Sequence, residues 1–527
     1  MYLGVRVYDI ISDFLESSCI GHHRVMEFNQ QGTLDIGAVI IILINYQLLT
    51  IKQNPKRAYA GRDRKNRLNL RRGKATAYWN ILLSRCLDIP IDVLGSTLSS
   101  KLEKSLLVVD PSTATTTTAI GSSYTSCASS ARFWESLLET HRVPYLLLRV
   151  ADMRYVLKSK VTALLLYEEL QSQLRDPSFE KWVRKLRSVI SHQVQKQLRA
   201  YEASSLTYAK PNHYFWHSII STSHGKGKTP SHSWPQCVIP SYQIQELLHT
   251  WNDLRSKGQN AIMAKFINLI CLETNFLEGM FSFRPEVAST LVQVGFIHQI
   301  PLFGESGITG GAVRDHVEIM SILQDTRKAL YWLNELQSHP SESPLTIDTL
   351  LTLHKTLMKT GQILNIHSLS ASPTKAAGTQ LKYTNIGETR QTTGVNLTGY
   401  RLGFKLDFCP HDKVNDELRM FCELYNELIR RKDIDPFAAA AWIIHNFLMI
   451  HPFGDGNSRL SRILASVPLM NKGLPPLCIP YSSKNTYLSL LNSMRESKDS
   501  GETCYEGLMG HLYEGMKVSL NLLRIVR

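Results

Sequence analysis

The stretch "HPFGDGNSRLSR", residues 451–462, holds a histidine, an aspartate, an asparagine and two arginines within twelve positions. It directly follows "PFAAAAWIIHNFLMI", residues 436–450. Proline is favoured at the first position of a helix and the alanine-rich run after it continues one, so this segment predicts a helix that runs into His451. The reactive side chains therefore follow at the end of a helix, where backbone polar groups lack helical partners.

The loop after this helix has the composition of a phosphate site. Gly454 and Gly456 permit a tight turn, and we expect Asn457 and Ser458 to begin a second helix. The free backbone N–H groups at a helix start bind anions such as phosphate. The segment thus predicts a helix–loop–helix unit with an anion site at its second helix.

The charged side chains suit phosphoryl or nucleotidyl transfer. Asp455 can hold Mg²⁺, which usually takes one or two carboxylates and completes its shell with water and phosphate oxygens. Arg459 and Arg462 are three residues apart, share a helix face and can hold further phosphate oxygens. His451 can take a proton from an attacking hydroxyl group near neutral pH.

The stretch resembles the signature of Fic-domain proteins, H-P-F-x-[D/E]-G-N-[G/K]-R-x-x-R. "TLLTLHKTLM", residues 349–358, and "MNKGLPP", residues 470–476, are similar to neighbouring parts of that family. The resemblance covers roughly residues 260–515. It implies a mainly α fold: a Fic-type helical core with a small β-hairpin flap, preceded by a helical region and an N-terminal segment of no assigned fold.

The resemblance also implies an activity, namely transfer of AMP from ATP to a Ser, Thr or Tyr hydroxyl of a target protein. The implied roles are general base (His451), Mg²⁺ ligand (Asp455), α-phosphate contact (Asn457), β/γ-phosphate clamp (Arg459, Arg462), further loop contacts (Gly454, Gly456, Ser458) and nucleobase contact (Tyr487). "YTNIGETRQTTGVNLTGYRLGFKLDFC", residues 383–409, reads as a hairpin, and its part near 395–408 would be the flap that aligns the target by strand addition.

A second motif lies upstream in "TNFLEGM", residues 274–280. Self-inhibited Fic proteins carry [S/T]-x-x-x-E-[G/N] on a helix, which we expect here at about 260–279. The matching residues are Thr274, Glu278 and Gly279. By this resemblance Glu278 faces Arg462 and removes a γ-phosphate ligand, while its charge opposes that of ATP.

Ser458 stands where the family has glycine or lysine, so alternatives stay open. The same site could remove AMP or transfer another phosphate-containing group. The asparagine that often follows Tyr487 in the family is not obvious, since Arg495 lies near its place. From a different class, the chain could be a catalytically silent scaffold that keeps the Fic fold and binds a partner protein.

The remaining chain is less informative. We divide it into a basic and Ser/Thr-rich region at 1–131, a helical region at 132–240 that ends in a linker, and a Fic domain at 241–515. Ten Lys/Arg between residues 52 and 74 supply most of the net charge of +14 and suggest a nuclear-import signal or an RNA-contacting tail, although a solvated segment is the plainer reading. We expect an intracellular protein, cytoplasmic or nuclear, with no membrane span, no nucleic acid partner and a homodimer as one option.

Overall fold

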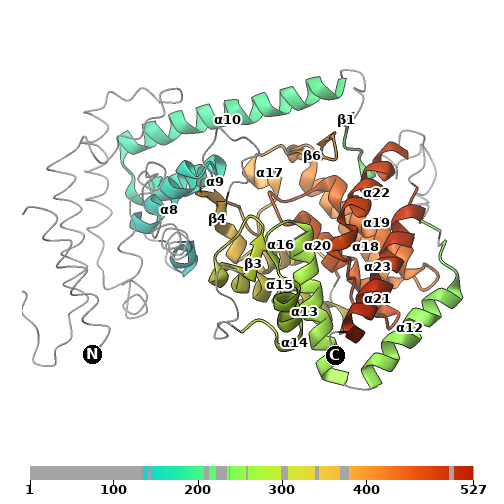
Figure 1. Ribbon diagram of the computed structural model, residues 1–527. Coiled ribbons are helices and arrows are strands. Elements are labelled where there is room, and N and C mark those ends of the chain that lie inside the picture. The colour runs from blue at the N-terminus through green and yellow to red at the C-terminus, as the bar shows by residue number, and fades with distance from the viewer. Residues whose placement is uncertain are drawn as a thin grey trace, which may run out of the picture. The chain divides into compact units, whose positions relative to one another are not determined.

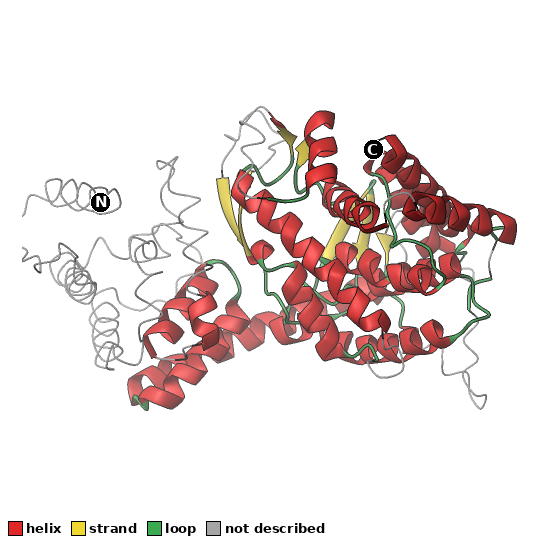
Figure 2. Cartoon of the chain, turned by 90° about the horizontal axis from the view of Figure 1, so that it is seen from below, coloured by secondary structure: helices red, strands yellow, loops and turns green. Residues whose placement is uncertain are grey.

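The computed structural model describes residues 132, 135–140, 142, 144–206, 213–220, 234–236, 238–256, 259–297, 307–338, 344–367, 379–497 and 504–525. These residues belong to one structural unit and are mainly helical, as predicted (Figure 2). The predictions for residues 1–131, including the basic segment at 52–74, lie outside the described residues.

In the described part of the region before the core, helical residues 135–140 precede α8 (Pro144–Val156), α9 (Lys160–Leu174) and α10 (Pro177–Leu206). Helix α10 is the long helix along the upper edge of Figure 1. Apolar residues recur at three- and four-residue steps along "FEKWVRKLRSVISHQVQKQL", residues 179–198, and form a stripe on one helix face. Phe179, Leu186 and Ile190 of that stripe are buried, but Val189 is 37% exposed. Helix α10 packs against the neighbouring helix α9.

The core is built around α19 (Pro436–Ile450), all of whose residues are buried. The Asp435 side chain caps its first turn by accepting hydrogen bonds from the N–H groups of Phe437 and Ala438, so the predicted helix from 436 to 450 is confirmed. The helices that contact α19 directly are α18 (Val414–Arg430), α20 (Asn457–Leu464), α21 (Ser466–Asn471) and α23 (Glu506–Ile525). The other core helices are α12 (Ser241–Ser256), α13 (Gln259–Leu277), α14 (Pro285–Val294), α15 (His316–Ser338), α16 (Ile347–Leu357) and α22 (Lys484–Ser497).

The strands are short and lie around this core. Strands β2 (Ser282–Phe283) and β3 (Ile308–Gly310) pair antiparallel, as do β4 (Ile363–His367) and β5 (Thr379–Tyr383). A third sheet has the order β1-β7-β6, with β1 (His213–Tyr214) parallel to β7 (Phe404–Asp407) and β6 (Thr398–Arg401) antiparallel to it. Three 3₁₀ turns join the elements: η3 (Thr360–Gln362), η4 (His411–Lys413) and η5 (Tyr481–Ser483).

The predicted hairpin at 383–409 is correct only in its second half. Strands β6 and β7 form a hairpin at 398–407, within the expected flap at 395–408. The first half instead holds the short helix α17 (Arg390–Thr393), which Gly394 ends in the left-handed conformation. The buried Arg390 holds this turn through hydrogen bonds that no local sequence pattern reveals.

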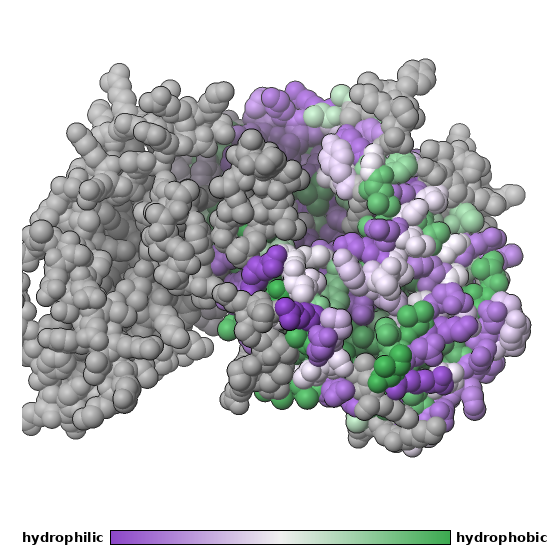
Figure 3. Space-filling model, in the orientation of Figure 1, coloured by the Kyte–Doolittle hydropathy of each residue, from purple (hydrophilic) through white to green (hydrophobic). Residues whose placement is uncertain are grey.

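The hydropathy of the described face does not mark any further structural region. Hydrophilic and hydrophobic residues are interspersed on the described face that Figure 3 shows. Within the described ranges, none of the helices combines the length and the apolar character that crossing a bilayer requires.

Candidate active site

His451 sits where α19 ends, and its backbone and ring are both held. It adopts the left-handed conformation (φ 50°, ψ 59°), and its N–H donates to the carbonyl of Phe447 at 2.9 Å. Its imidazole stacks on the ring of Phe408 with centroids 3.9 Å apart. Phe408 directly follows β7, so the hairpin of β6 and β7 positions the histidine ring.

Arg390 connects the same hairpin to His451 by hydrogen bonds. It was not among the residues predicted from the sequence. Its buried guanidinium donates to four carbonyl oxygens, those of His451 (2.7 Å), Val395 (3.1 Å), Cys409 (2.6 Å) and Ile450 (3.0 Å). Burial lowers the pKa of Arg390 to about 10, which still leaves it charged at neutral pH. Because carbonyl groups of both the α19 end and the flap segment share one cation, their relative position is fixed.

The turn after His451 depends on one glycine rather than two. Gly456 has φ +80°, and an added Cβ would lie 2.8 Å from the sulfur of Met358. Gly454 has no positive φ, and an added Cβ would meet nothing within 4 Å. Both glycines were expected to permit the turn, but only Gly456 has a conformation that favours glycine; any residue can adopt the backbone conformation of Gly454.

Asn457 and Ser458 begin α20, as predicted. The amide of Asn457 accepts from the N–H of Phe453 and donates to the carbonyl of the same residue, each at 2.9 Å, so its side chain closes the loop. Its expected contact with an α-phosphate stays a prediction. Ser458 lies within the helix and has no positive φ, so serine there carries no left-handed strain.

His354 on α16 packs against the loop that follows α19. It was not among the residues predicted from the sequence. Its ring stacks on Phe453 with centroids 3.8 Å apart. The N–H of Gly387 donates to Nδ1 at 3.0 Å, so Nε2 carries the proton and donates to the carbonyl of Asp455, also at 3.0 Å. Burial lowers the pKa of His354 to about 4 and keeps the ring neutral at physiological pH.

Asp455 is partly exposed and surrounded by positive charge. Lys382 of β5 forms an ion pair with its Oδ2, the N–H of Gly456 donates to Oδ1 at 2.6 Å, and Nη2 of Arg459 lies 3.9 Å from Oδ1. Burial acts to raise the pKa of Asp455, but Lys382 and Arg459 outweigh it and hold that pKa well below its usual range. An ionised carboxylate that is partly exposed fits a Mg²⁺ ligand.

The two arginines of the motif both contact α13, at different residues. Nη1 of Arg459 donates to the side-chain oxygen of Asn275 at 3.2 Å. Nε of Arg462 donates to the Thr274 hydroxyl at 2.8 Å, and its Nη2 donates to the Thr274 carbonyl at 3.1 Å and to Oε1 of Glu278 at 2.7 Å. The arginines are buried, and α13 gives hydrogen-bond acceptors to both guanidinium groups.

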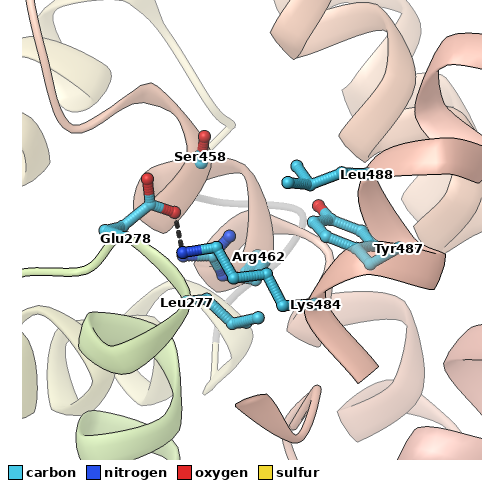
Figure 4. A pocket seen from close by; sticks show the side chains of 7 residues that line it. All are labelled: Leu277, Glu278, Ser458, Arg462, Lys484, Tyr487 and Leu488. Carbon is cyan, nitrogen blue, oxygen red and sulfur yellow. Dashed lines mark hydrogen bonds and ion pairs between the residues drawn. The ribbon is translucent and has the colours of Figure 1, made fainter. Parts of the chain in front are cut away.

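Glu278 lies just beyond the end of α13, in a turn rather than on the helix as expected. Gly279, with φ +68°, forms that turn, and its N–H donates to the carbonyl of Phe276 at 2.9 Å. The turn points the Glu278 carboxylate at Arg462, and the two side chains line the same cavity of about 190 Å³ (Figure 4). The cavity is lined by Leu277, Glu278, Ser458, Arg462, Lys484, Tyr487 and Leu488.

The cavity thus gathers four of the predicted site residues, Glu278, Ser458, Arg462 and Tyr487, from three separate parts of the chain. Lys484, one turn before Tyr487 on α22, was missed, although a lysine at that spacing lies on the same helix face. Arg495 does not line this cavity, since its guanidinium donates to Leu491 and Asn492.

Residues 344–469 match the model of the Fic/DOC family. A Fido domain-containing protein of Dictyostelium discoideum is 44% identical over 61 residues, which cover 12% of this chain and 42% of that protein. The protein adenylyltransferase fic-1 of Caenorhabditis briggsae is 24% identical over 250 residues, 47% of this chain and 42% of that protein. The chain spans less than half the length of these curated relatives.

Solved structures of proteins named Fic are also similar to this chain, at lower sequence identity. A Fic domain-containing signaling protein from Bacteroides thetaiotaomicron gives a TM-score of 0.40 at 18% identity, over 54% of this chain and 97% of that one. A fragment of Fic-1 from Caenorhabditis elegans gives a TM-score of 0.33 at 13% identity, over 82% of this chain and 98% of that one.

Proposed function

Because residues 344–469 form a Fic/DOC family domain, we propose that the protein is a protein adenylyltransferase whose own Glu278 inhibits it. The substrates are ATP and a target protein with a Ser, Thr or Tyr hydroxyl. The observation that carries the proposal is the cavity between α13, α20 and α22, where Arg462 and the start of α20 face Tyr487. Backbone N–H groups, a guanidinium and an aromatic side chain are what a nucleotide requires.

In the proposed reaction His451 removes the proton from the target hydroxyl. The hydroxyl oxygen attacks the α-phosphorus of ATP, the bond to the bridging oxygen breaks, and pyrophosphate leaves. The N–H groups at the start of α20 and the guanidinium groups of Arg459 and Arg462 would hold the phosphates. Asp455 would hold Mg²⁺, which when bound offsets the negative charge of the phosphates.

The ring of His451 is suited to this role because Phe408 and the α19 end fix it before any substrate arrives. Phe408 follows the flap strand β7 directly, so a target aligned on the flap would lie near the base. Strand β1 already pairs with one edge of β7. A target strand would therefore add to the outer edge of β6, where Tyr400 is 76% exposed.

Glu278 would inhibit this reaction by occupying Arg462. The carboxylate takes a donor that a γ-phosphate would use, and it places a negative charge at the cavity where the negative charge of ATP must enter. Thr274 holds the same guanidinium by two further hydrogen bonds. Displacement of Glu278 alone would leave Arg462 anchored and in place for phosphate.

The test is incubation of the Glu278→Gly variant with ATP that carries the label in either the α- or the γ-phosphate, in the presence of cell lysate. We expect protein labelling above that of lysate alone with the α-labelled ATP only, and no such increase with a Glu278→Gly/His451→Ala control. Labelling from γ-labelled ATP would show phosphoryl transfer instead. No labelling in spite of measurable ATP binding would leave a nucleotide-binding scaffold and refute the transferase.

A further inference from the structure

The hairpin of β4 and β5 brings a lysine to the proposed metal ligand. Lys382 lies in β5 opposite Leu364 of β4, and its ammonium group forms the ion pair with Oδ2 of Asp455. The two residues are 73 positions apart, and the sequence motif that contains Asp455 says nothing of Lys382. The Lys382 side chain is 43% exposed and the Asp455 side chain is 32% exposed, so solvent can reach the ion pair.

The hairpin is anchored next to this lysine by the helices that precede the core. The hydroxyl of Tyr383 donates to Oε1 of Glu135 at 3.0 Å. Glu135 also accepts two hydrogen bonds from Arg154 of α8, at 2.9 and 2.7 Å. Arg154 lies over the Tyr383 ring at 5.8 Å from its centroid. Because successive side chains of a strand point to opposite faces, a fixed Tyr383 directs Lys382 toward the other face, where Asp455 lies.

A divalent ion at Asp455 would find few other protein ligands. Among the residues that the structure describes, no group of three or more His, Cys, Asp or Glu side chains is placed to hold a metal. The ion would depend on Asp455 together with water and phosphate oxygens. The ammonium group of Lys382 occupies one of the two oxygens of this carboxylate, and Oδ1 already accepts from the N–H of Gly456.

We propose that Lys382 is a tethered cation that competes with the divalent metal ion for Asp455. The ammonium group and the metal ion carry like charges and share one carboxylate, so contact of Lys382 with Asp455 weakens metal binding when no nucleotide is bound. In this arrangement the helical region contributes to the site through Tyr383, Glu135 and Arg154. The inference rests on the proposed function, in which a nucleotide supplies the phosphate oxygens that favour the metal ion over the lysine.

The first test measures Mn²⁺ binding by electron paramagnetic resonance on the full chain without nucleotide. We expect Lys382→Met to tighten Mn²⁺ binding roughly five-fold, a modest change because partly exposed ion pairs contribute little. Lys355→Met is the matched control, since Lys355 is an exposed lysine that pairs with Glu139 and its loss changes the net charge equally. Adding Asp455→Asn to Lys382→Met should abolish the gain. Equal Mn²⁺ affinity in the two lysine variants, or weaker binding in Lys382→Met, overturns the proposal.

The second test uses the wild-type chain and does not depend on a variant. Reductive methylation followed by mass spectrometry reports how freely each lysine amine reacts. We expect Mg²⁺ to increase the methylation rate of Lys382 and to leave that of Lys355 unchanged. A rate at Lys382 that Mg²⁺ does not change overturns the proposal. Neither test involves AMP transfer, so a failure here is separate from a failure of the proposed activity.

Discussion

Nη2 of Arg462 donates to Oε1 of Glu278 across 2.7 Å, although the two residues are 184 positions apart. The contact joins the last turn of α20 to the turn after α13 and closes one side of the cavity beside Tyr487. The guanidinium is nearly buried, whereas the Glu278 side chain is 26% exposed. The arginine is thus the fixed partner of the pair, and the glutamate is the partner that solvent can reach.

Removal of the Glu278 carboxylate should tighten nucleotide binding. We expect Glu278→Gly to raise the affinity for Mg²⁺–ATP roughly ten-fold in isothermal titration calorimetry, because Arg462 regains a free donor and a repulsive charge is lost. Glu278→Gln keeps the size of the side chain and removes its charge, so it should give an intermediate affinity. Equal affinity in all three proteins would remove the basis for inhibition by Glu278.

Gly454 and Gly456 offer a matched pair of substitutions. Gly456→Ala should lower the free energy of unfolding by about 2 kcal/mol, because alanine is strained at φ +80° and its Cβ would meet Met358. Gly454→Ala should leave stability within about 0.5 kcal/mol of wild type, since its Cβ meets nothing. Urea unfolding measures both. The same Gly454→Ala protein should bind ATP more weakly if phosphates enter the open space beside Asp455.

Arg390 should be needed for stability as well as for the position of His451. We expect Arg390→Leu to destabilise the protein by about 3 kcal/mol or more in urea unfolding, because four carbonyl oxygens lose their donor in the interior. Arg390→Lys should recover only part of this loss, since one ammonium group cannot reach all four oxygens. A wild-type free energy of unfolding in Arg390→Leu would contradict the role given to this residue.

His354 should make stability depend on pH in the acidic range. Burial lowers its pKa to about 4 in the folded protein, while the unfolded chain titrates near the ordinary value of 6.5. Between these values the unfolded state binds more protons, so stability falls as the pH drops from 6.5 toward 4. From pH 7.5 to pH 5 the contribution of His354 amounts to a loss of about 2 kcal/mol.

The measurement for His354 is a comparison of wild type with His354→Gln by urea unfolding at both pH values. Other histidines, among them His411 and His511, also have lowered pKa values through burial and contribute to the slope of the wild type. The difference between the two proteins isolates His354. A variant that loses as much stability as wild type between pH 7.5 and pH 5 would show that His354 does not titrate as described.

Much of the fold could be predicted where the signal is local. The Asp435 cap, Pro436 and the alanine-rich run specify α19, and its predicted extent is confirmed. The hairpin of β6 and β7 was recognised from its composition, but its predicted start at 383 was wrong because Arg390 folds that part into α17. The hairpin of β4 and β5 was not predicted, since the residues that join the strands, 368–378, contain no two-residue turn signal.

The candidate site likewise has features that the local sequence predicts and features that it does not. The motif at 451–462 predicted a loop with reactive side chains between two helices, which is how it folds. The family resemblance named both Glu278 and its partner Arg462, although no spacing along the chain by itself indicates that the two side chains meet. His354, Lys382, Arg390 and Phe408 were given no role from sequence, because each acts on the motif from an element that is distant along the chain.

By itself the sequence determined the chemistry available in the loop and the helices on either side of it, because helix capping, glycine turns and residue types act over a few positions. Only the tertiary structure decided which of these groups meet. It placed Glu278 on Arg462, Lys382 on Asp455, and Phe408 against His451. The reason is physical: an ion pair or a ring contact depends on distance in space, and the packing of the whole core sets that distance.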